Sequence, residues 1–268
     1  MKSFALATFL GLLIAPAPTS AQWLNPRDPG LPRTRDDKPN LSAPAPRTRD
    51  GKPDLSGVWR PEPDPAGVPD PFAPEVLPRY FLNIAVDLKP EEVPFQAWAL
   101  ALFKERGARQ GADDPISKCQ PIGVPAIDTV PVPFKIIPTP KQIVILYEGD
   151  TTFRQVFMDG RRLSQDPQPT FMGYSRGRWE GDTLVVDTTG ITERSWLDRF
   201  GHPHSDALHV IERFRRRDVG HMDIEITIDD PKAYTRPITY TQKQILLPDT
   251  DLFEYFCSEN EKDVAHFK

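Results

Sequence analysis

Short runs in which hydrophobic and polar residues alternate dominate the chain from Phe134 onward. The clearest is 221–229, where every second side chain is apolar and those between are charged or carry a hydroxyl group. Alternation with a period of two is typical of a β-strand that buries one face. The apolar positions are Met222, Ile224, Ile226 and Ile228. The pattern therefore predicts β structure through the C-terminal half of the chain.

Turns rich in glycine separate the predicted strands and keep them close together along the chain. The expected strands are 55–60, 143–148, 152–158, 171–178, 182–189, 207–217, 221–229, 237–247 and 252–257. Strands of this length and spacing imply a sandwich or a barrel. Because successive strands read as hairpins, we predict a mainly β fold, an antiparallel β-barrel of about eight to nine strands.

One helix is predicted, from Pro90 to about Arg106. Acidic residues stand in its first turn and basic residues in its last, and Gly107 follows as a stop signal. Its apolar residues fall on one stripe at helical spacing. They are Phe95, Trp98, Ala99, Leu102 and Phe103. We expect this helix to pack on the outside of the barrel or to close one of its ends.

The N-terminus predicts a secretory signal peptide over residues 1–21. Lys2 precedes an apolar run from Phe4 to Ala15, and small residues precede Gln22. This run is too short to span a bilayer, and no later apolar run is long enough. We therefore expect an exported protein, periplasmic or secreted, without a membrane span.

Residues 22–52 read as an extended arm rich in proline and charge, ahead of a single barrel domain over 53–268. The arm contains two near copies, PRTRDDKPNLS (32–42) and PRTRDGKPDLS (46–56). Two copies do not make a solenoid, which needs at least three. They indicate either a duplicated linker, whose removal leaves folding intact, or an arm that wraps the domain or a neighbouring subunit. The second case would permit a homo-oligomer.

Export changes the interpretation of the two cysteines, Cys119 and Cys257. In an oxidising compartment an even number of cysteines favours a disulfide, with two buried thiols as the alternative. Closing so long a loop would stabilise the fold by about 4–5 kcal/mol on the chain-entropy model. The formal net charge of −5, with acidic and basic residues intermixed, argues against nucleic acid as a partner.

Charged residues interrupt the apolar faces of two predicted strands. Glu212 lies between Val210 and Phe214, and Arg154 shares a face with Val156. A carboxyl group on an apolar face has a raised pKa, which suits a general acid or base, unless an arginine pairs with it structurally. A mostly apolar lumen with a few polar groups is typical of a small-molecule site. The polar groups expected to face the lumen are Glu212, Arg154, Tyr174 and Arg176.

The segment Glu193–Ser205 concentrates polar and aromatic residues between two predicted strands. Loops on a rigid scaffold often carry function. His202 and His204 invite three interpretations: a metal site, acid–base chemistry with a histidine oriented by Asp198, or a loop held together by hydrogen bonds. The spacing to Glu212 fits known metal sites poorly, and we predict none. The candidate ligand-binding residues here are Trp196, Arg199 and Phe200.

Several chemistries find no support in the sequence. The chain contains no Gly-x-Ser-x-Gly elbow, no phosphate-binding glycine loop and no dinucleotide fingerprint. A cysteine nucleophile is excluded if both thiols are oxidised. Any reaction should therefore need no cofactor.

Five long strings carry a family resemblance: PDLSGVW, FRQVFMDGR, GRWEGDTLVVDTTG, WLDRFGHPHSDALHV and IDDPKAYTRP. With them, the chain from Pro53 onward resembles a family of exported bacterial proteins with a β-rich, lipocalin-like (calycin-type) domain. The resemblance implies export and this fold. Barrels of the broader class include carriers of hydrophobic ligands and cofactor-independent enzymes.

The expected function is a cofactor-independent lyase or isomerase that acts on a small hydrophobic or aromatic molecule by proton transfer. Glu212 and one of the two loop histidines would exchange the proton, and Asp198 would orient the histidine. Arg154, Arg199 and Tyr174 would orient the substrate or stabilise negative charge. The alternative is a carrier of such a molecule, and an envelope interaction module that uses the arm is a third possibility.

Overall fold

The computed structural model describes residues 26–69, 76–163, 167–255 and 257. The predicted signal peptide, 1–21, lies outside the described residues. Within the described ranges no helix has the length and apolar character needed to cross a bilayer.

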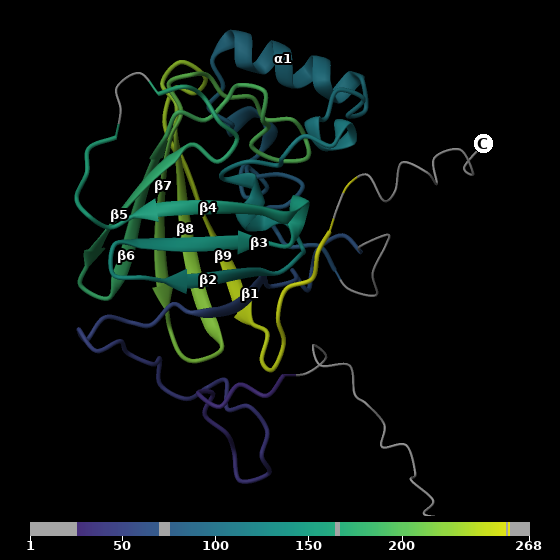
Figure 1. Cartoon of the computed structure of the whole chain (residues 1–268). Helices are drawn as coiled ribbons and strands as arrows, with labels where there is room; N and C mark the ends of the chain where they lie inside the picture. Colours follow the sequence, from purple (N-terminus) through teal and green to yellow (C-terminus); the bar gives the residue numbers. More distant parts are fainter. Residues whose placement is uncertain (1–25, 70–75, 164–166, 256, 258–268) are drawn as a thin grey trace, which may run out of the picture.

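A closed barrel forms the body of the molecule, with its strands neighbouring each other in chain order (Figure 1). This confirms the predicted mainly β barrel with one helix, and it is consistent with a lipocalin-like fold. The strands are β1 (Gly57–Pro61), β2 (Phe134–Pro138), β3 (Gln142–Tyr147), β4 (Thr152–Phe157), β5 (Tyr174–Glu180), β6 (Thr183–Thr189), β7 (His209–Arg216), β8 (His221–Asp229) and β9 (Ile238–Leu246). The strand expected at 252–257 is not formed in the described part of that segment.

One pairing departs from the antiparallel pattern, because β4 and β5 run parallel. Two parallel strands cannot be joined by a hairpin turn. The two strands pair only at Val156–Ser175 and Phe157–Arg176. The barrel therefore has a short seam between β4 and β5.

The predicted alternation along β8 is confirmed. Met222, Ile224, Ile226 and Ile228 are fully buried, and each faces the barrel interior. The adjacent β9 follows the same period, but its inward positions include polar side chains. These are Tyr240, Gln242 and Gln244, all buried.

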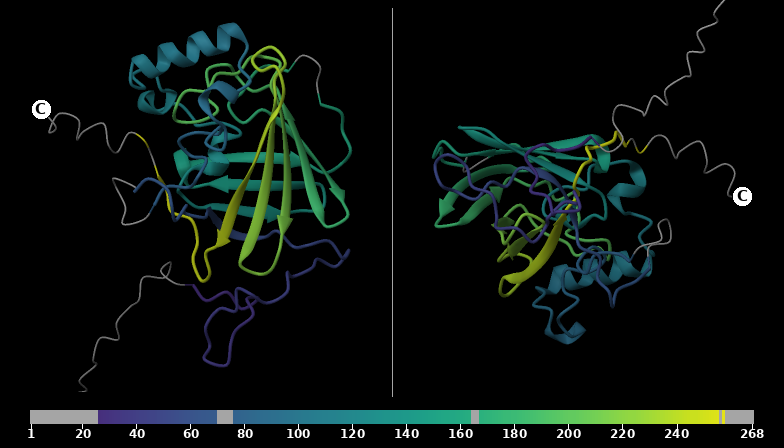
Figure 2. Two further views of the ribbon diagram at one scale, coloured as in Figure 1. Left: turned by 180° about the vertical axis from the view of Figure 1, so that it is seen from behind. Right: turned by 90° about the horizontal axis from the view of Figure 1, so that it is seen from below.

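The helix is shorter than predicted. Pro90–Glu92 forms only a 3-10 turn, and α1 spans Ala97–Ala108. Val93 is extended, as expected of a residue that precedes proline, so the chain cannot continue as a helix there. Figures 1 and 2 show α1 across the upper end of the barrel. Its buried residue is Ala99, and the indole N–H of Trp98 donates to the Lys232 carbonyl at 2.7 Å.

The two copies in the arm fold into the same turn. Thr34 N–H donates to the Lys38 carbonyl at 2.8 Å, and Thr48 N–H donates to the Lys52 carbonyl at 2.9 Å. Asp37 and Gly51, which occupy the same place in the two copies, both have a positive φ. The sequence duplication is thus a duplication of structure.

Both turns are anchored to the chain's own barrel, below the strands in Figure 1. Arg33 pairs with Asp249 at 2.5 Å, and the equivalent Arg47 pairs with Asp182 at 2.6 Å. Backbone bonds from Gly220 N–H to the Leu41 carbonyl (2.7 Å) and from Val219 N–H to the Ala43 carbonyl (2.9 Å) add to this contact. The described part of the arm is therefore docked on the domain.

The predicted disulfide between Cys119 and Cys257 is present, with Cα atoms 5.5 Å apart. It ties the end of a 3-10 turn, Pro115–Lys118, to the C-terminal segment. A disulfide across so long a loop is consistent with an extracytoplasmic protein.

The contact between Gly220 and the arm generates a stability prediction. A Cβ at Gly220 would lie 2.5 Å from the Leu41 Cβ, so Gly220→Ala should push the first turn off the barrel. We expect the free energy of unfolding to fall by about 1–3 kcal/mol and trypsin to cleave the arm faster, as measured by urea denaturation and limited proteolysis. Gly107→Ala, where an added Cβ meets nothing within 4 Å, is the control. Equal behaviour of the two variants would contradict the docking.

Candidate functional site

Asp198 organises the loop at the upper end of the barrel. Its Oδ1 accepts hydrogen bonds from the backbone N–H groups of Gly201 (3.0 Å) and His202 (3.1 Å). Its Oδ2 accepts from the Ile84 N–H at 2.8 Å and lies 2.5 Å from Nδ1 of His202. A buried carboxylate with this many donors holds an irregular loop in one conformation.

His202 joins the same loop to α1. The imidazole is buried and stacks on the Phe95 ring, with centroids 5.3 Å apart and planes 10° apart. The Phe103 ring lies 4.4 Å from it on a tilted plane. The contact with Asp198 places a proton on Nδ1, so this nitrogen donates. His202 therefore packs the helix onto the loop.

His204 lies in a separate buried network. Its Nδ1 is 3.1 Å from the Ser205 carbonyl oxygen, and its Nε2 is 2.9 Å from the Ser195 hydroxyl. Burial lowers the pKa of His204, so the ring is neutral and donates from Nδ1 to the carbonyl. Asp230 accepts from the Ser205 N–H at 2.6 Å and from its hydroxyl at 2.8 Å. These bonds secure the second half of the loop.

A cleft of about 550 Å³ opens between α1 and this loop. Trp196, Arg199 and Phe200, three residues predicted to bind a ligand, all line it. Phe200 is 50% exposed, so its ring is accessible from the cleft. Other lining residues are Leu82, Phe103, Arg106, Gly107, Gln110, Gly111, Asp114 and Ser117.

The charges in this cleft are unbalanced. Arg199 pairs with Asp114 at 2.5 Å, and burial raises the pKa of that carboxyl. Arg106 stacks its guanidinium over the Trp196 ring at 4.6 Å and donates to the Gly201 carbonyl at 3.0 Å. Burial removes water from the Arg106 guanidinium and so lowers its pKa. With two guanidinium groups and one carboxyl group in its lining, the cleft has an electrostatic potential that attracts anions.

A second, much smaller cavity of about 10 Å³ lies deeper. It shares Asp114, Trp196 and Arg199 with the cleft, so the Arg199–Asp114 pair stands between the two. Asp198 and Ala126, the first residue of the 3-10 turn Ala126–Thr129, also line it. The space suits a single water molecule.

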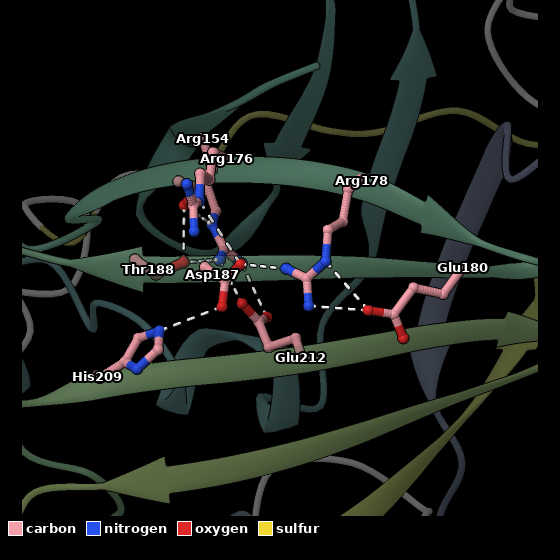
Figure 3. Close-up of polar contacts among 9 residues, drawn as sticks. Arg154, Arg176, Arg178, Glu180, Asp187, Thr188, His209 and Glu212 are labelled. Carbon is pink, nitrogen blue, oxygen red and sulfur yellow. Dashed lines mark hydrogen bonds and ion pairs between the residues drawn. The ribbon is translucent and has the colours of Figure 1, made fainter. Parts of the chain in front are cut away.

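Inside the barrel, Arg154 and Glu212 form a two-pronged ion pair (Figure 3). Arg154 Nη1 donates to Glu212 Oε1 at 2.9 Å, and Nη2 donates to Oε2. Two further guanidinium N–H groups donate to the Thr188 hydroxyl at 2.7 Å and the Ser175 hydroxyl at 3.0 Å. Both charged side chains are buried. The interpretation of Glu212 as the partner of an arginine is the one that the structure shows.

Asp128 is a third charged residue of the interior. One oxygen accepts from the Tyr147 hydroxyl at 3.0 Å, whereas Oδ2 lies 3.6 Å from Arg154 and has no hydrogen bond in the described structure. Burial, and next the charge of Glu212, raise the pKa of Asp128 well above its usual value. Desolvation therefore favours the protonated form of this carboxyl group.

Sequence reasoning missed Asp128, because it lies in an isolated 3-10 turn without a strand pattern. It also missed Tyr240, whose buried hydroxyl has no hydrogen-bond partner in the described structure and whose pKa burial raises. For Tyr240 a signal was available, since β9 alternates and every second position faces inward.

Tyr174 and Arg176 lie on the outer face of the barrel, not in the lumen. Ser175 between them is buried and faces inward, so its neighbours point outward. Tyr174 donates to the Gln168 carbonyl at 3.0 Å, and Arg176 lies 3.6 Å from Asp187. In Figure 3, dashed lines join Asp187 to Arg176, Arg178 and His209.

Neither cavity beside the histidine loop is lined by Glu212. Of the predicted site residues, Trp196, Arg199 and Phe200 together line the upper cleft. No three His, Cys, Asp or Glu side chains converge as metal ligands within the described ranges. Comparison with protein-family models, curated proteins and solved structures found no match. A function for this chain must therefore be inferred from the geometry of its own residues.

Removal of the Glu212 charge should destabilise the barrel. Glu212→Gln would leave the buried Arg154 without its anion, so we expect the free energy of unfolding to fall by about 3–5 kcal/mol, measured by urea denaturation. Glu225→Gln, on an exposed position of β8 and 3.9 Å from Arg213, is the matched control and should change little. A folded Glu212→Gln protein with the stability of the control would show that the ion pair is dispensable.

Asp128 should give the protein a measurable pH dependence. Its raised pKa means that the folded state holds a proton that the unfolded state loses above about pH 4. Its contribution to stability therefore declines as pH rises through the folded pKa. Asp128→Asn removes this titration, so its stability relative to the unmodified protein should rise between pH 5 and pH 8. A difference that does not vary with pH would contradict the assignment.

Proposed function

We propose that the protein is an exported carrier, periplasmic or secreted, of a small amphipathic molecule that binds in the upper cleft. The observation that carries this proposal is that Trp196, Arg199 and Phe200 line one cleft of about 550 Å³. A concave site with aromatic walls and a few polar groups is typical of small-molecule binding.

A carrier is better supported than the expected lyase or isomerase. His202 and Asp198 bind each other and hold the loop, and His204 is neutral and engaged at both ring nitrogens. Glu212 is neutralised by Arg154. A general acid or base must reach the proton that it transfers. None of these groups has that access in the described structure except Asp198, which borders the inner cavity.

The lining also supports a ligand class. Phe200 and Trp196 offer ring surfaces on which a flat apolar body can stack. Arg106 and Arg199 face a single carboxyl, Asp114, so an anionic group on the ligand would find a favourable potential. The ligand is thus a small aromatic or hydrophobic anion.

Truncation of Phe200 tests this site at little cost to folding, because half of the side chain is exposed. With 8-anilinonaphthalene-1-sulfonate as a probe in isothermal titration calorimetry, Phe200→Ala should weaken binding by about tenfold through the lost ring contact. Phe153→Ala is the matched control, since Phe153 is 61% exposed on the outer face of β4. Equal affinities for the two variants, or no binding by the unmodified protein, would overturn the proposal.

An acid–base enzyme is the second candidate, favoured by the raised pKa of Asp128 next to Glu212. A carboxyl that stays protonated at neutral pH can act as a general acid. Ala126, in the same 3-10 turn, borders the inner cavity. In D₂O, an enzyme of this kind would place deuterium in a ligand retained from cell extract, and Asp128→Asn would not. A carrier would return the ligand unlabelled.

A further inference from the structure

The barrel wall opens below the seam between β4 and β5. After the pair Phe157–Arg176 the chain leaves β4, while β5 continues to Glu180. Gly177 lies at this point, and a Cβ there would meet the Met158 sulfur at 2.5 Å. Met158 therefore fills the place where a neighbouring strand would otherwise continue.

A cavity of about 600 Å³ occupies this opening. Its walls are apolar side chains from the inner face of the barrel and from the turn between β2 and β3. Ile143 alternates inward with Ile145, and Trp179 lies on the inner face of β5, two residues after Gly177. The apolar lining consists of Leu55, Pro138, Pro140, Ile143, Met158 and Trp179.

The second turn of the arm forms the remaining wall. Arg47 binds both oxygens of Asp182, and Lys52 donates to the Gly181 carbonyl at 3.1 Å, so this turn is fixed to the hairpin between β5 and β6. Its lining residues are Thr48, Arg49, Asp50, Lys52 and Pro53. In Figure 1 the arm passes beside this hairpin and the β2–β3 turn.

Three charged residues line this rim, and of these only Arg49 has neither a hydrogen bond nor an ion pair with a described residue. Asp50 is held by the Thr48 hydroxyl at 2.5 Å, and Lys52 by the Gly181 carbonyl. Arg49 is exposed, lines the cavity, and has no hydrogen bond or ion pair with any described residue. An unpaired guanidinium at the edge of an apolar cavity is placed to bind a carboxylate or another anionic head group.

We propose that this cavity is a second binding site, which takes a molecule with an unbranched apolar chain and one anionic head group. The chain lies between Trp179, Met158 and Ile143, and the head group pairs with Arg49. The site is separate from the upper cleft, because it is built from the arm and the lower ends of the strands. It depends on the duplicated segment, since without the second turn the cavity has no outer wall.

The duplication itself supplies a matched control. Arg35 occupies in the first turn the place that Arg49 occupies in the second. Arg35 is also exposed, but it does not line the cavity. Arg49→Glu and Arg35→Glu therefore change the net charge equally and differ only in whether the new charge faces the site.

Titration calorimetry with dodecanoate and with dodecyltrimethylammonium, both below their micelle concentrations, tests the proposal on the mature chain. The unmodified protein should bind the carboxylate more tightly than the cation. Arg49→Glu should weaken dodecanoate binding by about tenfold and strengthen binding of the cation, because the head group then faces an opposite charge. Arg35→Glu should change neither affinity by more than about twofold.

Phe200→Ala separates this site from the upper cleft. Dodecanoate affinity should be unchanged in that variant, whereas the loss of naphthalenesulfonate binding reports on the cleft alone. Absence of dodecanoate binding, or equal effects of Arg49→Glu and Arg35→Glu, would overturn the proposal. A loss of dodecanoate binding in Phe200→Ala but not in Arg49→Glu would also overturn it and would assign the chain to the upper cleft.

Discussion

The buried ion pair between Arg154 and Glu212 is the constraint on which the barrel depends. Two charges removed from water are tolerated only with close geometry and with their remaining groups hydrogen-bonded. Here β4 supplies the arginine, while β5, β6 and β7 supply Ser175, Thr188 and Glu212. One guanidinium thus spans the seam where β4 and β5 share only two backbone pairs. Side-chain bonds replace the ladder that the parallel junction lacks.

The two ends of the barrel are covered in different ways. Below the seam the strands diverge, and the second turn of the arm covers the opening with Arg47 bound to Asp182. At the upper end, α1 and the histidine loop close the barrel through Asp198 and His202, and the cleft remains on their outer side. The buried ion pair lies between these two ends, and neither the upper cleft nor the lower cavity is lined by Arg154 or Glu212.

Regular patterns made the fold predictable, and irregular segments did not. The period-two pattern of β8 and the turn chemistry located most strands, because burial of one face forces alternation, but β2 (Phe134–Pro138) was not among the predicted strands. The parallel β4–β5 pair was not visible, since the sequence of 158–173 does not show in which direction the chain returns. Tyr174 and Arg176 were placed on the wrong face by one residue, and a shift of one position inverts a strand. Asp128 gave no signal because its 3-10 turn has no period.

The segment Glu193–Ser205 illustrates why residue type locates a site better than it assigns a role. Three of its residues, Trp196, Arg199 and Phe200, line the cleft beside α1. A loop without secondary structure must, however, satisfy its own backbone donors, and side chains such as Asp198 do so. The buried side chains of His202 and His204 form hydrogen bonds within the loop. Phe200 and Arg199 instead line the cleft. Which of two neighbouring residues builds the loop and which lines the cleft depends on the packing of α1, which is distant in sequence.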